Sequence, residues 1–370
     1  MSTVLIRASS YDYGDLKKTI FGIMDSHAGD LIQKGSRVII KPNLLAPASP
    51  EKAIVTHPHV IKAVVEYVIQ REGIAQISDS PSVVTGSFEK TITESGLKSA
   101  IKGLSVEYRE FKNSLSVEVG KPFEKIEVAE DAAQADVLIN LPKLKTHTQM
   151  LLTLGIKNLF GCVVGLKKPE WHLRTGVDRE MFATLLVKVC QAVSPSFTLL
   201  DGILSMEGQG PGRGGSPRKL GLLMASRDVV AIDIAVCRMF GLSPRALLTN
   251  KIALEQNMTR ENIVIEGELP IIDDFKLPEI TPVVFGPDRF HGFFRRHLIQ
   301  RPECDDEICR LCGECWEYCP AEAISHTKKK INFDYEKCIR CYCCIEVCPH
   351  GALQARETLI GRGTRKLLKI

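Results

Sequence analysis

The chain has no long apolar run, little net charge and few cysteines outside its C-terminal part. No segment approaches the roughly 18 apolar residues that identify a membrane-spanning helix. Residues 1–7 have neither a basic start nor a long apolar core, so we expect no signal peptide. Lys and Arg outnumber Asp and Glu by 48 to 44, an excess too small to predict binding to nucleic acid. These absences favour a cytoplasmic protein with no membrane span and no nucleic-acid partner.

The motifs of several enzyme classes are also missing. The sequence contains no Walker motif, no G-x-S-x-G and no H-E-x-x-H. The stretch Gly210–Gly215 matches G-x-G-x-x-G, but we expect a strand after it and no strand leading straight into it, which argues against a dinucleotide site. We expect a flexible lid over the strand ends, with Glu207 and Arg213 reaching inward; a plain surface loop is the alternative.

Cysteine is concentrated at the C-terminal end, where ten of the 13 residues lie after Glu303. Two runs read C-x2-C-x2-C-x3-C-P, the spacing with which bacterial ferredoxins hold [4Fe–4S] clusters, the last cysteine of each run binding the other cluster. Structural zinc usually takes two separated pairs of ligands, and disulfide frameworks belong to small secreted chains. We therefore predict two clusters, held by Cys309, Cys312, Cys315 and Cys348 and by Cys338, Cys341, Cys344 and Cys319. The nearby Cys304 and Cys343 are expected to be spare.

Short apolar strands alternate with amphipathic helices before this region. Strands are expected near residues 37–40, 74–78, 106, 136–141, 197–200 and 220–224, and helices near 15–31, 58–73, 88–101, 180–193 and 228–240. This alternation predicts an α/β fold with a mostly parallel sheet and helices on both faces. A small C-terminal α+β ferredoxin-like iron–sulfur domain follows it.

The change in composition predicts four segments. They are an α/β domain over residues 1–265, a linker with a basic helix over 266–302, a two-[4Fe–4S] domain over 303–358 and a basic tail over 359–370. The basic helix, at Arg289–Arg296, is expected to be a solvated linker helix; a docking surface for an acidic electron carrier is the alternative.

Polar side chains follow four of the predicted strands. The carboxyl ends of parallel strands share one edge of a sheet, where ligands bind. Lysines near glycines that expose backbone N–H groups suit an anionic group, and a histidine can act as a general acid near neutral pH. The alternative is a set of solvated lysines and a structural histidine. We predict a site for an anionic small molecule, with catalytic candidates Asp79, Lys145, His147 and Asp201 and binding candidates Lys41, Asn43, Ser80, Lys143, Lys157, Asn158, Glu207 and Arg213.

Several of these segments together resemble a known family. The sequence resembles the family called domain of unknown function 362 at residues 41–43, 78–81, 141–147, 155–158 with Gly161, 201–202, 206–208, and Asp228 with Asp233. The C-terminal part resembles a bacterial-type two-[4Fe–4S] ferredoxin domain. The first resemblance implies no settled reaction.

Three functions are compatible with these features. We favour an iron–sulfur oxidoreductase that receives electrons from a soluble donor such as a ferredoxin and reduces an anionic small molecule at the strand ends. The alternatives are an electron-transfer or assembly subunit whose large domain binds a protein partner, and a non-redox enzyme with structural or sensory clusters. Two clusters form a relay, and a simple carrier needs no large α/β domain, which is why we favour the first.

Overall fold

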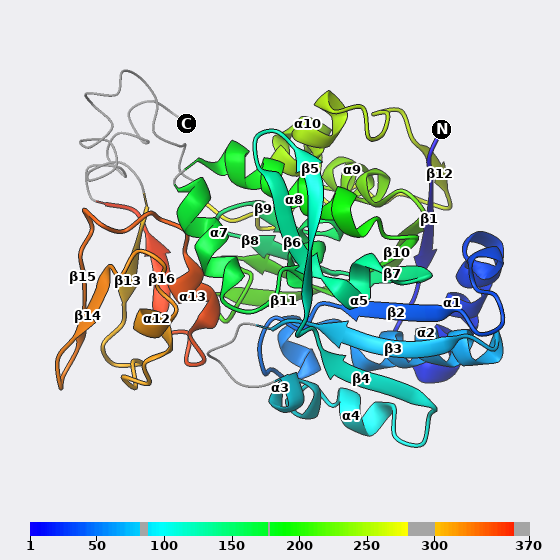
Figure 1. The fold of residues 1–370 in the computed structure, drawn as a ribbon, viewed down its shortest axis with the longest axis horizontal. Coiled ribbons are helices and arrows are strands. Elements are labelled where there is room, and N and C mark those ends of the chain that lie inside the picture. Colours follow the sequence, from blue (N-terminus) through cyan, green and yellow to red (C-terminus); the bar gives the residue numbers. More distant parts are fainter. Residues whose placement is uncertain (82–87, 177, 280–299, 359–370) are drawn as a thin grey trace.

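In a computed structural model of the protein, the described residues are 1–81, 88–176, 178–279 and 300–358. The larger unit is built around one sheet (Figure 1). In the described residues this 10-stranded sheet consists of β1 (Thr3–Ala8), β2 (Arg37–Pro42), β3 (Ile74–Asp79), β4 (Val106–Glu110), β7 (Val137–Leu141), β8 (Lys143–His147), β9 (Leu151–Thr153), β10 (Phe197–Gly208), β11 (Gly215–Ser226) and β12 (Val264–Glu266). The strand order is β12-β1-β11-β10-β7-β2-β3-β4, and β8 pairs with β10 and β9.

Most neighbouring strands of this sheet are parallel. β10, β7, β2, β3 and β4 pair in parallel in that order, and β12 is parallel to β1. β11 is antiparallel to both of its neighbours, β1 and β10. The predicted fold class, a mostly parallel α/β sheet with a small cysteine-rich C-terminal unit, is confirmed.

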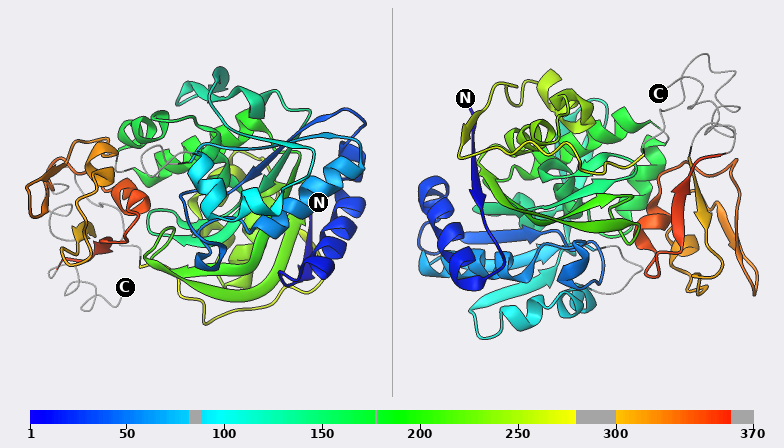
Figure 2. Two further views of the ribbon diagram at one scale, coloured as in Figure 1. Left: turned by 90° about the horizontal axis from the view of Figure 1, so that it is seen from below. Right: turned by 180° about the vertical axis from the view of Figure 1, so that it is seen from behind.

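Alternating apolar residues on the strands supply two cores, one on each face of the sheet. Helices cover both faces (Figure 2). Val38 and Ile40 belong to one core and Ile39 to the other, because successive side chains of a strand point to opposite faces. The first core includes α1 (Tyr13–His27), α2 (Pro58–Gln70), α3 (Phe88–Glu94) and α4 (Leu97–Ala100). The second includes α5 (Glu130–Ala133), α6 (Gly155–Asn158), α7 (Lys167–Thr175), α8 (Arg179–Val193), α9 (Val229–Met239) and α10 (Leu248–Glu255).

The glycine-rich stretch differs from our prediction. β10 continues past its apolar start to Gly208 and leads straight into this stretch, and β11 begins at Gly215, so residues 209–214 form the tip of a long antiparallel hairpin. The polar residues Ser205 and Glu207 remain in the ladder, opposite Arg218 and Ser216. Our prediction that no strand leads into the stretch was wrong, because we ended the strand where its apolar residues end.

Other elements complete the larger unit. The hairpin of β5 (Ser114–Gly120) and β6 (Glu124–Ala129) lies outside the main sheet, and single 3-10 turns occur at Gly29–Leu31, Pro50–Lys52, Leu159–Cys162 and Pro244–Ala246. The chain after β12 packs back on the larger unit: Phe275 stacks on Phe240 at 4.1 Å, and the Lys276 backbone oxygen accepts from Gly208 N at 2.6 Å. The predicted basic helix at residues 289–296 and the basic tail at 359–370 lie outside the described residues. No helix in the described ranges has the length and apolar character needed to cross a bilayer.

In the described residues the smaller unit has two short antiparallel two-stranded sheets and two short helices. β13 (Arg301–Cys304) pairs with β16 (Leu353–Arg356), and β14 (Ile324–His326) pairs with β15 (Ile331–Phe333). The helices are α12 (Glu314–Glu317) and α13 (Cys343–Val347), and each begins within or beside one of the cysteine runs. Apolar side chains such as Tyr342, Ile345 and Leu353 fill its core. The unit lies against one end of the larger domain, with α13 at the contact (Figures 1 and 2).

Candidate functional site

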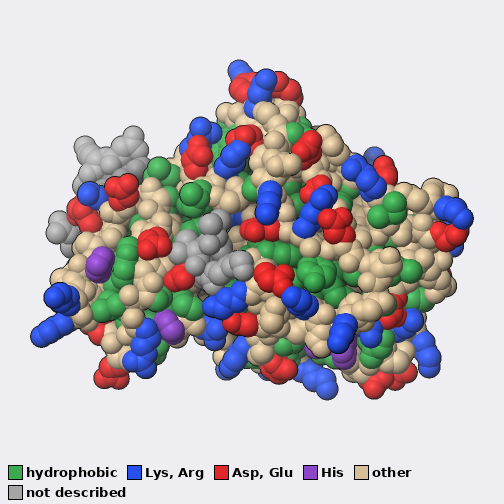
Figure 3. Space-filling view, turned by 60° about the horizontal axis from the view of Figure 1, so that its bottom comes forward, with side chains coloured by type: hydrophobic (Ala, Val, Ile, Leu, Met, Phe, Trp, Pro, Cys, Tyr) green, Lys and Arg blue, Asp and Glu red, His purple; other side chains and the backbone are tan. Residues whose placement is uncertain are grey.

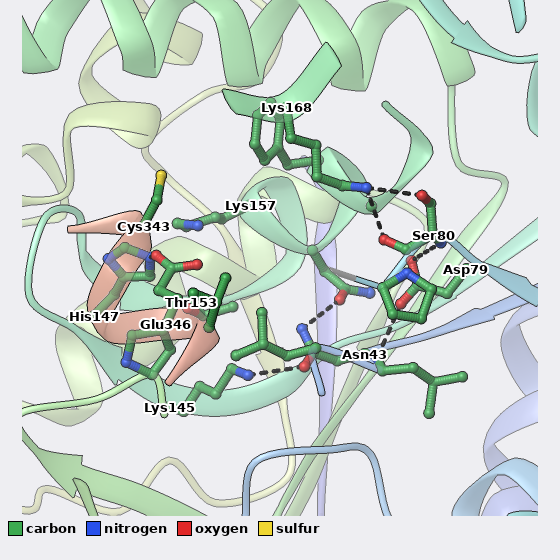
Figure 4. Close-up of a pocket in the computed structure, with 18 of the residues that line it drawn as sticks. Asn43, Asp79, Ser80, Lys145, His147, Thr153, Lys157, Lys168, Cys343 and Glu346 are labelled. Atoms are coloured by element: carbon green, nitrogen blue, oxygen red, sulfur yellow. Dashed lines mark hydrogen bonds and ion pairs between the residues drawn. The ribbon is translucent and has the colours of Figure 1, made fainter. Parts of the chain in front are cut away.

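The ends of the parallel strands and the cysteine-rich unit line a common cavity (Figure 4). β2 and β3 contribute Lys41 and Asp79, β8 contributes Lys145 and His147, and α13 contributes the opposite wall with Glu346 and Cys343. We call this space the inner cavity. It lies where the rule for parallel sheets predicts a ligand site.

On one side of the inner cavity a buried ion pair is fully hydrogen-bonded. Lys41 Nζ lies 2.7 Å from Asp79 Oδ1, and the backbone N–H groups of Leu44 and Ser80 donate to the same carboxylate, each at 2.9 Å. Lys168 Nζ donates to the Ser80 backbone oxygen and hydroxyl at 2.8 and 2.9 Å. Since these charged groups already have hydrogen-bonding partners, we expect them to stabilise the fold and to contribute little to ligand binding.

A chain of amides positions the next lysine. Asn158 donates to Asn140 Oδ1 and accepts from Asn43 Nδ2, both at 2.8 Å. Asn43 then accepts from Lys145 Nζ at 2.8 Å, and Lys145 donates a second time to the Ile54 backbone oxygen at 2.7 Å. Burial lowers the pKa of Lys145 to about 7, with smaller contributions from neighbouring charges. Near neutral pH this side chain can therefore either give or take a proton.

The other side of the inner cavity holds less satisfied groups. In Figure 4, Lys157, His147, Glu346 and Cys343 lie together on this side, away from Asp79 and Ser80. Within the described ranges the Lys157 ammonium group makes no hydrogen bond. Its Nζ atom lies 6.0 Å from the centroid of the Phe160 ring. Burial lowers the pKa of Lys157. A cation of this kind in a closed space is suited to an anionic ligand.

His147 is buried and its proton position is determined by its neighbours. Its Nδ1 accepts from the backbone N–H groups of Gln149 at 3.1 Å and Met150 at 3.3 Å, so Nε2 carries the proton of the neutral ring. Burial, and then Lys157, lower the pKa of His147 to about 4. His147 is therefore a neutral N–H donor at neutral pH, whereas the sequence suggested a general acid.

The sequence-predicted residues Lys143 and Asp201 lie in a different cluster. Lys143 Nζ and Asp201 Oδ2 are 2.8 Å apart, both side chains are buried, and the Tyr11 hydroxyl bonds to each of them at 2.8 and 2.7 Å. His57 stacks on Tyr11 at 3.6 Å. An irregular β8–β10 pairing, in which Lys143 faces Asp201 but Lys145 faces Met206, separates these two lysines. None of the residues of this second cluster, Tyr11, His57, Lys143 and Asp201, lines the inner cavity.

Two further candidates also lie away from the inner cavity. Glu207 accepts from the Lys276 backbone N–H at 3.2 Å on the long hairpin. Arg213, at the hairpin tip, lies close to Gly351 and lines a second space that we call the outer cleft. The predicted lid residues therefore hold the hairpin against its neighbours, and the inner cavity receives only Pro211 from this tip.

Three wall residues of the inner cavity were not predicted from the sequence. Lys168 and His172 are one helical turn apart on α7, and Glu346 lies inside the second cysteine run. The spacing of Lys168 and His172 is a signal that could have been noticed, because side chains at i and i+4 share a helix face. No sequence pattern indicates that Glu346 faces the other domain.

The cysteines surround two further small cavities. Cys309, Cys312, Cys315 and Cys348 line one, and Cys319, Cys338, Cys341 and Cys344 line the other. The grouping is the same as the crossed arrangement expected from the spacing. No three His, Cys, Asp or Glu side chains of the described residues converge on a point suited to one metal ion. Four sulfurs spaced around a small apolar hollow fit a polynuclear cluster better than a single zinc ion.

The two extra cysteines lie near these sets. Cys304 is next to Cys309, and Cys343 is buried beside Cys341 and also lines the inner cavity. Charged groups of both signs are interspersed on the outer face shown in Figure 3.

Comparisons with known proteins agree with this two-part organisation. The family described as domain of unknown function (DUF362) matches residues 38–238, and the family described as 4Fe-4S binding domain matches residues 331–354. A thylakoid-associated protein of Synechocystis sp. is 34% identical over 310 residues, which cover 81% of this chain and 95% of that protein. The lactate racemase apoprotein of Thermoanaerobacterium thermosaccharolyticum aligns with a TM-score of 0.34 and 12% identity, over 54% of this chain and half (50%) of that one.

Proposed function

This chain belongs to the DUF362 family and carries a 4Fe-4S binding domain, and from that premise we propose that it is an iron–sulfur oxidoreductase with two [4Fe–4S] clusters. Its substrate would be an anionic small molecule bound in the inner cavity. One observation carries the proposal: α13, which contains Cys344, also forms a wall of that cavity through Cys343 and Glu346. Few residues therefore separate the proposed electron store from the proposed substrate.

The cysteine sets fit the clusters. We propose that Cys309, Cys312, Cys315 and Cys348 hold one cluster and Cys319, Cys338, Cys341 and Cys344 the other, because each set lines its own cavity. When bound, such clusters supply storage and transfer of single electrons. A soluble ferredoxin-type carrier is the proposed donor, and a cytoplasmic, reducing location would keep the thiols available for iron.

The cavity residues divide between binding and proton transfer. Lys157 and the Nε2–H group of His147 would hold an acid group of the substrate, because both residues line the cavity and His147 Nε2 is buried without a hydrogen-bonding partner in the described ranges. Lys145 would give a proton to the reduced substrate, since its pKa of about 7 leaves it partly protonated near neutral pH. The buried surroundings strengthen both interactions by excluding water.

A binding assay tests the substrate site. Calorimetric titration of the anaerobically purified, iron-loaded protein with sulfate and with oxalate compares a tetrahedral with a planar acid group. We expect saturable binding of at least one anion and an at least tenfold loss of affinity in Lys157→Ala, about the effect of losing one buried charged hydrogen bond. Lys167→Ala is the matched control, because Lys167 pairs with Glu127 outside the cavity. Equal affinities of the parent and Lys157→Ala would refute the site.

A buried small-molecule cavity also separates this proposal from the partner-binding alternative. The inner cavity is bounded by buried side chains of both domains, so a folded protein partner could not enter it. An electron-transfer or assembly subunit would instead expose its binding surface. Tight anion binding that depends on Lys157 therefore supports the reductase, and its absence supports the alternative.

A further inference from the structure

Glu346 places a carboxylate among the donors of the inner cavity. It extends from α13 toward the strand ends, and its side chain is only 15% exposed. Its Oε1 lies 2.9 Å from Nε2 of His147, and Lys157 and His172 line the same cavity. The Glu346 carboxyl group thus faces the donors of the larger domain across the inner cavity.

This contact is close but poorly formed. Glu346 Oε1 and His147 Nε2 are both buried, yet their geometry does not make a hydrogen bond. His172 Nδ1 is a third buried polar atom without a partner in the described residues. Buried polar atoms normally find partners, so three unsatisfied ones in one region indicate a group that they would bind better. Asp79, the other carboxylate of the cavity, is fully hydrogen-bonded by comparison.

Glu346 also stands between two spaces. The outer cleft shares Leu45, Glu346 and Val347 with the inner cavity. Lys90, Glu94 and Arg213 line the outer cleft, and Lys90 Nζ lies 3.9 Å from Glu94 Oε1. A Glu346 side chain that left the inner cavity would therefore find the Arg213 guanidinium group in the outer cleft.

We propose that Glu346 is a built-in competitor for the substrate: its carboxylate occupies the place of the substrate's acid group and moves toward the outer cleft when the substrate binds. This inference rests on the proposed function and defines the substrate more narrowly. The substrate carries a carboxylate or a similarly sized oxyanion, which accepts from His147 and pairs with Lys157 as Glu346 does in its absence. It enters from the outer cleft, past Arg213 and Lys90.

The test is a titration of the iron-loaded protein with oxalate, in the parent and in Glu346→Gln. An internal competitor that fills a site in about nine molecules of ten weakens the apparent affinity about tenfold, so we expect Glu346→Gln to bind oxalate about tenfold more tightly. Glu346→Asp, with a side chain one carbon shorter, should also bind more tightly. Glu317→Gln is the control, because Glu317 is an exposed glutamate of the same unit on α12.

The outcomes separate this inference from the function on which it rests. Unchanged or weaker oxalate binding in both Glu346 variants overturns the competitor, because it means that Glu346 is neutral or supports the ligand. If Lys157→Ala still abolishes binding in that case, the anion site itself stands. If neither Lys157 nor Glu346 affects binding, both proposals fail. The visible absorption of each variant checks that its clusters are retained, since Glu346 is two residues from Cys344 and Cys348.

Discussion

At the scale of single residues, burial changes the acid–base behaviour of Lys145. Its ammonium group is buried, donates to two oxygens, and has a pKa lowered to about 7 by desolvation. A buried lysine loses its charge more easily because the low-dielectric surroundings favour the neutral form. The charge of the inner cavity should therefore change across the physiological pH range.

This pKa predicts a pH dependence of anion binding. Sulfate keeps its charge near neutral pH, so a change in its affinity reports on the protein. The charged form of Lys145 predominates below pH 7 and is lost above it, and we expect the sulfate affinity to fall as pH rises through about 7. Calorimetry at several pH values measures this fall. In Lys145→Met the fall should be reduced in size, and an identical pH profile in this variant would exclude Lys145 as its cause.

The sequence identified many of these residues but not their states. Lys41, Asn43, Asp79, Ser80, Lys145, His147, Lys157 and Asn158 were predicted together because strands of a parallel sheet end at one edge, and all of them line the inner cavity. The sequence could not predict that Lys143 and Asp201 neutralise each other, because that depends on an irregular pairing between β8 and β10. The pKa values of Lys145 and His147 depend on burial by distant segments.

At the scale of elements, the cysteine runs of the smaller unit carry the strongest prediction. Cys312 lies in the loop before α12 and is the exposed member of its set. Its replacement should not disturb a packed core, so any loss of iron can be assigned to loss of a ligand. Each [4Fe–4S] cluster needs four protein ligands.

We expect Cys312→Ala to lose one cluster and about half of the iron, since the other cluster has an intact ligand set. Iron and sulfide analysis of anaerobically purified protein measures this directly. Cys304→Ala should keep the full iron content, because Cys304 is outside both predicted sets. An unaltered iron content in Cys312→Ala contradicts the ligand assignment.

The turn Leu159–Cys162 that follows α6 brings the chain against the buried ion pair of the cavity. A Cβ atom at Gly161 would lie 2.1 Å from Asp79 Oδ1 and 2.6 Å from Lys41 Nζ. We expect Gly161→Ala to destabilise the protein by about 1–3 kcal/mol, the usual cost of overpacking a core, and to weaken oxalate binding. Urea denaturation measures the stability.

Gly22 provides the matched control for this variant. It lies in α1 with open space around the position of a Cβ atom, so Gly22→Ala should be neutral or stabilising by about 0.5–1 kcal/mol. Similar stabilities of the two variants would mean that the Gly161 position tolerates a side chain and that the Lys41–Asp79 pair is not packed as described.

Hydrophobic patterns predicted most elements but not all of their ends. The strands and helices with strong apolar periodicity, such as β2, α2 and α8, lie close to their predicted positions. The pattern failed in β10, whose second half is polar and glycine-rich but is held by the ladder with β11. Cross-strand pairing of this kind is a long-range interaction that local composition does not reveal.

At the scale of the whole molecule, the position of the smaller unit could not have been predicted. The sequence indicated a strand-end site and two clusters as separate features. The structure brings α13 against the strand ends, so that Cys343 and Glu346 become part of the cavity wall (Figure 4). This contact depends on the shapes of two folded surfaces, and no motif in either segment specifies it.

The central claim is that the inner cavity and the clusters act on each other. The most direct test is a redox titration of the iron-loaded protein, followed by its visible absorption, with and without saturating oxalate. A negative charge bound in the cavity disfavours addition of an electron nearby, so oxalate should lower the midpoint potential of at least one cluster, and Lys157→Ala should lose the effect. Midpoint potentials unchanged by oxalate, in a protein shown by calorimetry to bind it, would contradict the account.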